Sequence, residues 1–374
     1  MNASAPVILA AGGTGGHLFP AEAVADELLT RGHVLALVTD RRGAGFGGAL
    51  ARIDRHTIRA GSPSGDLHQM VGGLMNIAAG TLQARSLLKR LRPKAVVGFG
   101  GYPSLPTLIA APRLKVPAAV HEQNALLGRV NRYASARVAA IALSFEATAG
   151  ISSAQRHKVV VTGNPVRGAI AAARGIAYQR PGPSGDIRLL VTGGSQGATV
   201  FSEVVPEALK RLGPDLHARL RITQQCRPED AERVAAFYRD EGIEANIAPF
   251  FDDLAERLAA AHLVICRAGA STVAELATAG RPAILVPYPF ARDDHQTLNA
   301  AILADAGAAW SMAQPDFTPG ALVSRLGQLL AEPETLADAA ARALRLGRPD
   351  AAARLADLVE RLARGAPVAL ERAS

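Results

Sequence analysis

Glycines, a hydroxyl and an imidazole gather in residues 12–17, directly after the apolar run Val7–Leu9. A strand that enters a helix through glycines leaves backbone N–H groups at the helix N-terminus, where anions and sugar hydroxyls can approach closely. Thr14 adds a hydroxyl there, and His17 adds a ring that titrates near neutral pH. Because the glycine spacing departs from Gly-x-Gly-x-x-Gly, this turn alone fits a packing role as well as a binding loop.

A second copy of this pattern lies at Ile187–Ala198, where an apolar run is again followed by Gly-Gly, a hydroxyl residue and a further glycine. Open α/β sheets bind ligands beyond the carboxyl ends of their strands. The repeat therefore predicts two similar α/β domains, each of which presents a glycine loop to one shared cleft.

A further strand-to-helix turn, after the apolar segment Leu263–Cys266, places Ser271 and Thr272 in the first turn of a helix. A diphosphate could bind the N–H groups of that turn, and the helix dipole favours its charge. Glu275 follows one turn later. Its carboxylate could accept hydrogen bonds from two ribose hydroxyls, or it could be a capping partner for either hydroxyl residue, and both roles stay open.

Two other segments carry polar side chains that suit sugar recognition. A helix places Gln296 and Asn299 on one face, and paired amides supply the donors and acceptors that vicinal hydroxyls need. The polar run His121–Asn124 directly follows the apolar strand Ala118–Val120. We expect this run at the carboxyl edge of the first sheet, beside the glycine loops.

The elements that hold these residues alternate between strands and helices, which predicts an α/β protein of two domains. We expect the first domain over 1–163 and the second over 164–344, with helix 345–374 packing back on the first. A helix over Ala21–Leu29 is predicted to start near Pro20. The strands expected in the first sheet are Val7–Leu9, His33–Thr39, Ala95–Val97, Ala118–Val120, Val138–Leu143 and Val159–Val161.

The segment Leu67–Leu82 repeats apolar residues at close to helical spacing, and the basic stretch Arg85–Arg92 follows it. This segment is either a core-facing helix or an exposed apolar patch beside a basic cluster, as an interfacial protein would carry. Gly72, Gly73 and Gly80 weaken the predicted helix.

The composition of the 374 residues fits a globular protein, since 49% are hydrophobic and no stretch reaches the roughly 18 uninterrupted apolar residues of a membrane span. The 2 cysteines form no disulfide framework and no signal-peptide pattern occurs, so we expect a cytoplasmic protein. The net charge of +8 suits an anionic partner such as a nucleotide or an acidic membrane surface. Only 4% of residues are aromatic, which disfavours a nucleic-acid partner.

Motifs from residue 12 to residue 299, taken in order, resemble those of the MurG family of bacterial glycosyltransferases. The matching stretches are Gly-Gly-Thr-Gly-Gly-His-x-Phe-Pro-Ala, Gly-Phe-Gly-Gly-Tyr-Pro-Ser, His-Glu-Gln-Asn, Gly-Asn-Pro-Val-Arg, Gly-Gly-Ser-Gln-Gly-Ala, Arg-Ala-Gly-Ala-Ser-Thr-Val-Ala-Glu and Asp-His-Gln-x-x-Asn. The resemblance implies a GT-B glycosyltransferase fold, which consists of two facing Rossmann-like domains with a cleft between them.

The same resemblance implies an activity and a location. The enzyme would move N-acetylglucosamine (GlcNAc) from UDP-GlcNAc to the muramyl C4 hydroxyl of lipid I, which is undecaprenyl-pyrophosphoryl-MurNAc-pentapeptide. The product would be lipid II for peptidoglycan synthesis. The resemblance implies a peripheral protein at the anionic cytoplasmic face of the bacterial cell membrane, and it names no protein partner.

Residue by residue, the resemblance assigns substrate contacts to positions that match the family motifs. The nucleotide sugar and its surroundings would involve Thr14, Gly15, Gly16, Tyr102, Asn124, Arg167 and Ser195. The diphosphate and ribose would lie on Ala270, Ser271, Thr272, Val273, Ala274 and Glu275, and the sugar hydroxyls would meet Gln296 and Asn299. Phe251 stands where a usually aliphatic residue meets the uracil through its backbone, and His295 replaces a common Gln. The segment Leu67–Leu82 falls where the family has its membrane-docking patch.

The implied chemistry is an inverting displacement in which a hydroxyl attacks the anomeric carbon and UDP leaves. Helix N-termini and hydroxyls would neutralise the diphosphate in place of a cation, so we expect neither a metal nor a cofactor. His17, at a helix start in the acceptor-side domain, is our candidate general base. Its alternative role is to hydrogen-bond the donor without moving a proton.

Other functions stay open from the sequence. A hydrolysing UDP-GlcNAc 2-epimerase shares the architecture. A nicotinamide oxidoreductase would need Asp40 on a ribose. A non-catalytic scaffold that binds nucleotide sugars would give His17 no task.

Overall fold

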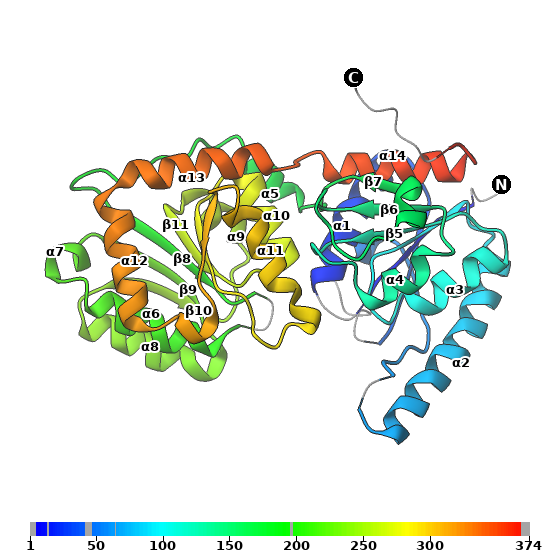
Figure 1. The fold of residues 1–374 in the computed structure, drawn as a ribbon, viewed down its shortest axis with the longest axis horizontal. Coiled ribbons are helices and arrows are strands. Elements are labelled where there is room, and N and C mark those ends of the chain that lie inside the picture. The colour runs from blue at the N-terminus through cyan, green and yellow to red at the C-terminus, as the bar shows by residue number, and fades with distance from the viewer. Residues whose placement is uncertain (1–4, 13–14, 42–46, 64, 195–196, 368–374) are drawn as a thin grey trace. The chain divides into compact units, whose positions relative to one another are not determined.

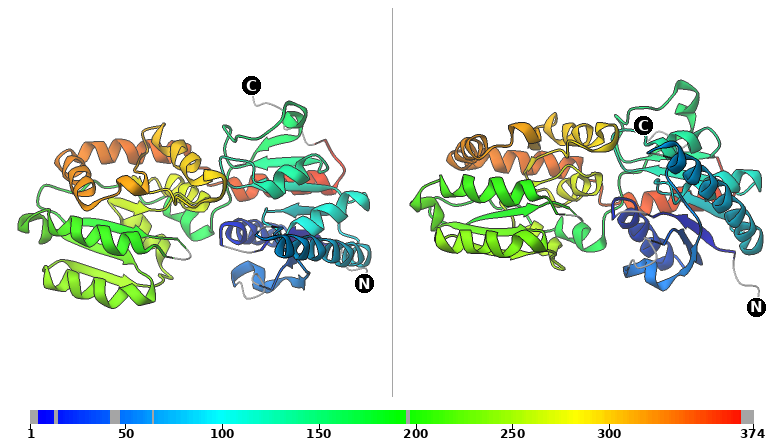
Figure 2. Two further views of the ribbon diagram at one scale, coloured as in Figure 1. Left: turned by 60° about the horizontal axis from the view of Figure 1, so that its bottom comes forward. Right: turned by 90° about the horizontal axis from the view of Figure 1, so that it is seen from below.

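The computed structural model describes residues 5–12, 15–41, 47–63, 65–194 and 197–367. The chain divides into two compact units, Met1–Arg167 with Asp350–Ser374 (unit 1) and Gly168–Pro349 (unit 2), which Figure 1 shows. The sequence places these divisions a few residues earlier, after residues 163 and 344. Each unit contains its own sheet with helices packed on it, as the views in Figure 2 also show.

Unit 1 is built on a 7-stranded sheet with the order β3-β2-β1-β4-β5-β6-β7 and parallel pairing throughout. The order reverses between β1 and β4. The carboxyl ends of these two strands therefore form the switch point at which doubly wound sheets bind ligands. The strands are β1 (Val7–Ala10), β2 (Leu35–Thr39), β3 (Asp54–Thr57), β4 (Ala95–Gly98), β5 (Ala118–Glu122), β6 (Ala140–Leu143) and β7 (Val159–Val161).

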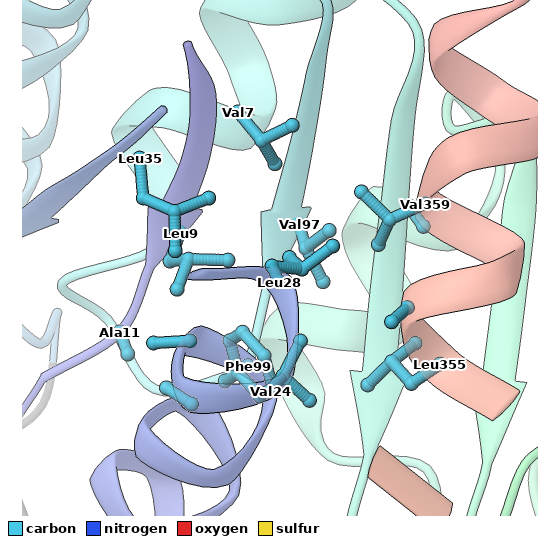
Figure 3. Close-up of a cluster of buried hydrophobic side chains, with 14 of the residues drawn as sticks. Val7, Leu9, Ala11, Val24, Leu28, Leu35, Val97, Phe99, Leu355 and Val359 are labelled. Atoms are coloured by element: carbon cyan, nitrogen blue, oxygen red, sulfur yellow. The ribbon is translucent and has the colours of Figure 1, made fainter. Parts of the chain in front are cut away.

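Helices bury both faces of this sheet, which explains why β1 is apolar at successive positions. Val7 and Leu9 pack on α1 (Gly15–Thr30) and α14 (Ala351–Ala363), as Figure 3 shows, whereas Ile8 belongs to the core on the other face. The helices of that other face are α2 (Leu67–Leu91), α3 (Leu105–Arg113) and α4 (Arg129–Ser135), and the short 3₁₀ segments of unit 1 are Gly48–Arg52 and Ser153–Lys158.

Unit 2 repeats this arrangement with a 6-stranded parallel sheet of order β10-β9-β8-β11-β12-β13. Its switch point lies between β8 and β11, so the loops after these strands are the expected ligand-binding positions. The strands are β8 (Ile187–Thr192), β9 (Leu220–Gln225), β10 (Glu244–Ala248), β11 (Leu263–Cys266), β12 (Ala283–Leu285) and β13 (Ala309–Ser311).

The core of unit 2 joins alternate β8 side chains to α6 (Thr199–Lys210), α8 (Pro228–Asp240) and α12 (Pro319–Ala331). A second set of helices packs together, and one of its members, α9, also contacts β8. This set is α5 (Gly168–Ala173), α9 (Leu254–Ala260), α10 (Ala270–Ala279) and α13 (Pro333–Leu346). The remaining helical segments are α7 (Pro214–His217), α11 (His295–Ala304), and the 3₁₀ turns Arg292–Asp294 and Gln314–Asp316.

The start of α1 differs from the prediction. The helix begins at Gly15, so Pro20 lies inside it rather than in its first turn. Proline has no N–H to give the carbonyl four residues earlier, which here belongs to Gly16. Because Gly16 is exposed, water can satisfy that carbonyl and the helix tolerates the proline.

The helix predicted over Leu67–Leu82 extends to Leu91 and continues through Gly72, Gly73 and Gly80. A Cβ on Gly73 would lie 2.5 Å from the carbonyl oxygen of Ser62, and one on Gly80 would contact the carbonyl oxygen of Arg59. The glycines therefore let the segment before α2 lie directly against the helix. Figure 1 shows the first half of α2 extending past α3.

The strand predicted over Ala118–Val120 also runs further than expected. His121 and Glu122 are the last two residues of β5 and are buried, so only Gln123 and Asn124 of the polar run follow the strand. The helix predicted over 345–374 is α14, which runs from Ala351 to Ala363 and belongs to unit 1, whereas α13 ends at Leu346 and belongs to unit 2.

Candidate functional site

The switch point of unit 1 is formed by two glycine loops that touch. A Cβ on Gly12, after β1, would lie 2.7 Å from Cβ of Pro103, which follows β4. Only glycine permits this approach, so the loop after β4 closes against the loop after β1. His17 lies in the first turn of α1 at this place.

The His17 ring contacts both a glutamine and the second glycine loop. Its Nδ1 lies 3.2 Å from Oε1 of Gln123, which follows β5. Gly100 and Gly101 have φ angles of 84° and 69°, and a Cβ on Gly101 would lie 3.1 Å from Cδ2 of His17. The ring is therefore held from two sides. Sequence reasoning placed the His121–Asn124 run near the glycine loops but did not identify Gln123 as a site residue.

His121 is fully buried behind Gln123. Its Nε2 lies 3.0 Å from the carbonyl oxygen of Gly163, and its Nδ1 lies 3.0 Å from Nε2 of Gln123. The ring also packs on Phe99, with 5.8 Å between the ring centroids. Burial lowers the pKa of His121 to about 4, so the ring is neutral at pH 7.

Glu122 organises the next loop. Its carboxylate accepts from N and Nδ2 of Asn124, both at 3.1 Å, and from Gly128 N and Asn131 Nδ2, both at 2.8 Å. A carboxylate that is only 2% exposed needs such donors. Asn124, a predicted substrate residue, is thereby fixed. The sequence feature that could have identified Glu122 as the residue that organises this loop is its position, since it is a charged residue directly after an apolar strand.

The other predicted residues of unit 1 lie around the same switch point. Gly15–Gly16 open α1, and Tyr102 packs partly buried on the sheet core. The Arg167 guanidinium lies 4.8 Å from the ring centroid of Phe19 in α1. Thr14 lies outside the described residues.

The glycine loop after β8 in unit 2 is held by Gln225, at the end of β9. Gln225 Oε1 accepts from Thr192 Oγ1 at 2.9 Å, and its Nε2 donates to the carbonyl oxygens of Gly194 at 3.0 Å and Pro249 at 3.1 Å. Gln225 therefore joins this loop to the segment after β10, a link that sequence reasoning missed. Ser195 lies outside the described residues.

The N-terminus of α10 fits an anion-binding site. Its first helical bond runs from Val273 N to Gly269 O at 2.9 Å, so the N–H groups of 270–272 have no partner four residues back. Ser271 Oγ is buried and has no hydrogen-bond partner among the described residues. The N-cap is Gly269, without a side-chain cap bond. A capping box needs a hydroxyl residue at the N-cap, so Glu275 forms no capping box with Ser271 or Thr272, which lie inside the helix.

Gln296 and Asn299 have different environments. Oε1 of Gln296 accepts from Tyr288 N at 2.9 Å, and its amide NH₂ has no partner among the described residues. Asn299 is fully buried, and its Nδ2 donates to the carbonyl oxygen of Ala268 at 3.1 Å. Asn299 therefore links α11 to the segment that leads into α10, whereas Gln296 presents donors.

The turn before α11 has an unusual backbone. Asp293 and Asp294 have φ angles of 55° and 50°, a left-handed conformation that is uncommon for non-glycine residues, less so for Asp, and that clusters at functional sites. His295 Nδ1 donates to the carbonyl oxygen of Arg292 at 2.7 Å, and Thr297 Oγ1 donates to Asp294 Oδ1 at 2.7 Å. These contacts hold the turn that positions Gln296.

Phe251, which stands where the family has an aliphatic residue, is stacked by an arginine. The Arg257 guanidinium lies 4.2 Å from the Phe251 ring centroid, and its Nε donates to Asp253 Oδ1 at 2.7 Å. The aromatic ring is nearly buried by this contact. Phe251 lies two residues after Pro249, whose carbonyl oxygen accepts a hydrogen bond from Gln225.

Arg267 is a second residue that sequence reasoning missed. Its buried Nη1 donates to the carbonyl oxygens of Val286 at 3.2 Å and Pro287 at 3.3 Å, and its Nη2 donates to Gln314 Oε1 at 2.7 Å. It ties the loop after β12 to the start of α10. The sequence feature that could have identified Arg267 is its position directly after a buried strand, at the start of the Arg-Ala-Gly motif.

The first half of α2 is exposed and apolar, so it is not the core-facing helix of the alternative prediction. Ile77 packs on the core, and a basic cluster on the same helix is exposed. The exposed apolar residues are Leu67, Met70, Val71, Leu74, Met75 and Leu82, and the exposed basic ones are Arg85, Lys89, Arg90 and Arg92. Among the described helices, none combines the length and apolar character needed to cross a membrane. The described residues contain no group of three or more His, Cys, Asp or Glu side chains that could hold a metal ion.

Two family models match the chain. The glycosyltransferase family 28 N-terminal domain matches residues 7–143, and the glycosyltransferase family 28 C-terminal domain matches residues 188–358.

The chain is also similar to curated proteins named UDP-N-acetylglucosamine–N-acetylmuramyl-(pentapeptide) pyrophosphoryl-undecaprenol N-acetylglucosamine transferase. The one from Rhodospirillum centenum is 56% identical over 355 residues, which cover 95% of this chain and 94% of that protein. The one from Rhodospirillum rubrum is 55% identical over 362 residues, which cover 96% of this chain and 92% of that protein.

Solved structures show the same likeness. The crystal structure of Acinetobacter baumannii MurG is 33% identical, covers 96% of this chain and 100% of its own, and has a TM-score of 0.77. A putative UDP-N-acetylglucosamine 2-epimerase from Listeria monocytogenes has a TM-score of 0.65 over 98% of both chains at 15% identity, a likeness of fold alone.

Proposed function

The chain belongs to the MurG transferases of glycosyltransferase family 28, and from this membership we propose how its residues carry out the reaction. The enzyme has a GT-B fold and transfers GlcNAc from UDP-GlcNAc to lipid I, which forms lipid II. The observation that carries this function is the 56% identity, over 95% of the chain, to the N-acetylglucosamine transferase from Rhodospirillum centenum.

Unit 2 binds the donor. The diphosphate accepts hydrogen bonds from the first-turn N–H groups of α10 and from Ser271 Oγ, and the positive end of the helix stabilises its charge. Glu275, one turn later, accepts from the ribose hydroxyls. Gln296 donates to the sugar, because Tyr288 already occupies its Oε1. The backbone at Phe251 meets the uracil.

Unit 1 supplies the proton acceptor. The muramyl C4 oxygen attacks the anomeric carbon, the bond from that carbon to the UDP oxygen breaks, and the hydroxyl proton moves to His17. The configuration at the anomeric carbon inverts. The charge that develops on the leaving diphosphate is stabilised by the α10 N-terminus, whose donors are already in place.

The anionic cytoplasmic surface of the membrane holds the enzyme near its lipid substrate. The support is the exposed apolar half of α2, followed on the same helix by exposed arginines and a lysine. Apolar side chains that enter the headgroup region and basic ones that meet anionic lipids are the two components of interfacial binding.

Incubation of the purified protein with labelled UDP-GlcNAc and a lipid I analogue tests the function. We expect the label to appear in a lipid-linked disaccharide and UDP to be released in equal amount. A parallel incubation without acceptor is analysed for the 2-epimer of GlcNAc. Formation of the epimer and no disaccharide would contradict the proposal and favour the epimerase.

A further inference from the structure

We propose that Gln123 is a positioning residue that fixes the tautomer of His17, with the proton on Nδ1 and the lone pair on Nε2, and that buried His121 sets the orientation of Gln123. The inference deepens the proposed function, because it rests on His17 as the base. It concerns which ring nitrogen takes the proton of the acceptor hydroxyl.

The chain of contacts begins at a backbone carbonyl. His121 Nε2 lies 3.0 Å from the oxygen of Gly163, and a carbonyl oxygen can only accept a hydrogen bond. Nε2 therefore carries the proton. Since burial lowers the pKa of His121 to about 4, the neutral ring has a single proton and its Nδ1 has the lone pair.

His121 then determines how the amide of Gln123 is oriented. The Nε2 group of Gln123 lies 3.0 Å from Nδ1 of His121 and 3.2 Å from the carbonyl oxygen of His121. Both atoms are acceptors, so both require the NH₂ end of the amide. The flipped amide would place Oε1 against two acceptors in a buried site, which costs the full desolvation penalty of unsatisfied groups. Oε1 is therefore the end that faces His17.

The last contact fixes the His17 ring. Its Nδ1 lies 3.2 Å from Oε1 of Gln123, which only accepts, so Nδ1 is the donor and Nε2 has the lone pair in the neutral ring. The glycine loop restrains the same ring from another side, since a Cβ on Gly101 would lie 3.1 Å from Cδ2 of His17. A ring with its proton on Nε2 could not accept a proton at that atom. This chain of hydrogen bonds from Gly163 through His121 and Gln123, here called the relay, keeps the lone pair of His17 on Nε2, where it can accept the proton.

Nitrogen NMR tests this tautomer without reference to activity. Two-bond ¹⁵N–¹H spectra of the full chain with labelled histidine, assigned by the loss of signals in His17→Gln, report which ring nitrogen of His17 carries the proton. We expect a protonated Nδ1 in the unsubstituted protein at neutral pH. A protonated Nε2 would overturn the proposal, and this result requires no variant of Gln123.

Two substitutions separate the relay from a packing role. Gln123→Met keeps the volume and removes the acceptor, so we expect mixed tautomers of His17. The kcat should fall roughly 10-fold to 100-fold, a part of the 10²–10⁴ that general-base catalysis contributes, with donor affinity unchanged. Gln123→Glu, which burial and the two facing acceptors keep protonated, still accepts from His17 Nδ1 and donates to His121 Nδ1, so we expect the unsubstituted tautomer. An unchanged His17 spectrum in Gln123→Met would overturn the proposal.

Ser144→Ala is the matched control. Ser144 Oγ donates to the carbonyl oxygen of Glu122 at 2.8 Å, so the variant loses a buried hydrogen bond beside β5 but no contact of the relay. We expect lower stability with the His17 spectrum and kcat unchanged. If Gln123→Met shows the predicted spectrum while His17→Gln keeps normal turnover, the role of His17 as base fails and the tautomer assignment stands.

Discussion

The backbone N–H of Tyr288 donates a 2.9 Å hydrogen bond to Oε1 of Gln296, and this bond decides which end of the glutamine amide meets a ligand. Tyr288 follows β12, and Gln296 is in the first turn of α11. Because the N–H needs an acceptor, the amide cannot flip without losing the bond. In the proposed donor site, Gln296 therefore acts as a hydrogen-bond donor to the sugar.

Gln296→Glu tests this donor role. The carboxylate still accepts from Tyr288 N–H but cannot donate to a sugar hydroxyl. We expect the KM for UDP-GlcNAc to rise roughly 2-fold to 10-fold, since one hydrogen bond contributes about 0.5–1.5 kcal/mol. Gln328→Glu, which makes the same change at an exposed position of α12, is the control and should leave KM unchanged. Steady-state kinetics that show a normal KM in Gln296→Glu would limit Gln296 to holding the Tyr288 loop.

His17→Ala should lower kcat by roughly 10²–10⁴ while donor affinity is largely kept, because a general base acts on the acceptor hydroxyl. Rapid-mix turnover and calorimetric titration with UDP-GlcNAc measure the two quantities. His17→Gln can hydrogen-bond but cannot take a proton at neutral pH. Near-normal turnover in that variant would make His17 a binding residue.

Leu74→Asp with Met75→Asp should weaken binding to anionic vesicles and leave turnover on a soluble acceptor intact. Both side chains are exposed on α2, and full burial of one such side chain is worth about 1.5–3 kcal/mol. Asn76→Asp with Ser86→Asp adds the same charge on exposed polar positions without removing apolar surface. Co-sedimentation with vesicles measures the binding of both double variants. An equal loss of vesicle binding in the two would show that binding depends on charge and not on the apolar side chains.

His262 should make unit 2 less stable as the pH falls from about 6.5 towards 4. Burial lowers the pKa of His262 to about 4, whereas an unfolded histidine titrates near pH 6.5. Between these values the unfolded chain binds a proton that the native chain does not, so the free energy of unfolding decreases; above about pH 6.5 both states are neutral and nothing is lost.

Urea unfolding at several pH values measures this dependence. His262→Asn keeps an acceptor for Arg188 N, which donates to His262 Nδ1 at 3.1 Å, and removes the titrating group. We expect a smaller loss of stability towards pH 4 in the variant. His68→Asn, at an exposed position of α2, is the control. A pH dependence unchanged by His262→Asn would contradict the assignment.

Apolar runs and glycine turns were sufficient to predict the alternation of strands and helices, since each pattern is local. The lengths of several elements were not predictable in this way. Gly73 and Gly80 read as helix breakers, yet the helix continues because the backbone at Ser62 and Arg59 approaches them. Such a contact joins segments whose closeness no local pattern records.

The same limit applies to the site. Residue types and motif order indicated His17, Ser271 and Gln296, because each lies in or beside a strand-to-helix turn. The contact between His17 and Gln123 spans 106 residues and depends on the strand order β1-β4-β5. Gln225 is similar, since it donates to Gly194 after β8 and to Pro249 after β10. Which side chains support the site residues depends on the order of the strands in the folded sheet, and this order cannot be read from local sequence patterns.

Helix α14 has a consequence for how the protein is made. The core of unit 1 beside β1 contains four side chains of α14, which are Leu355, Leu358, Val359 and Leu362. The ribosome adds these residues only after all of unit 2. Unit 2 is continuous in the chain and can complete its core during translation, whereas the nascent unit 1 leaves exposed the part of its core that α14 covers until that helix emerges. Unit 1, whose strands are made before unit 2, is thus the last of the two units to complete its core.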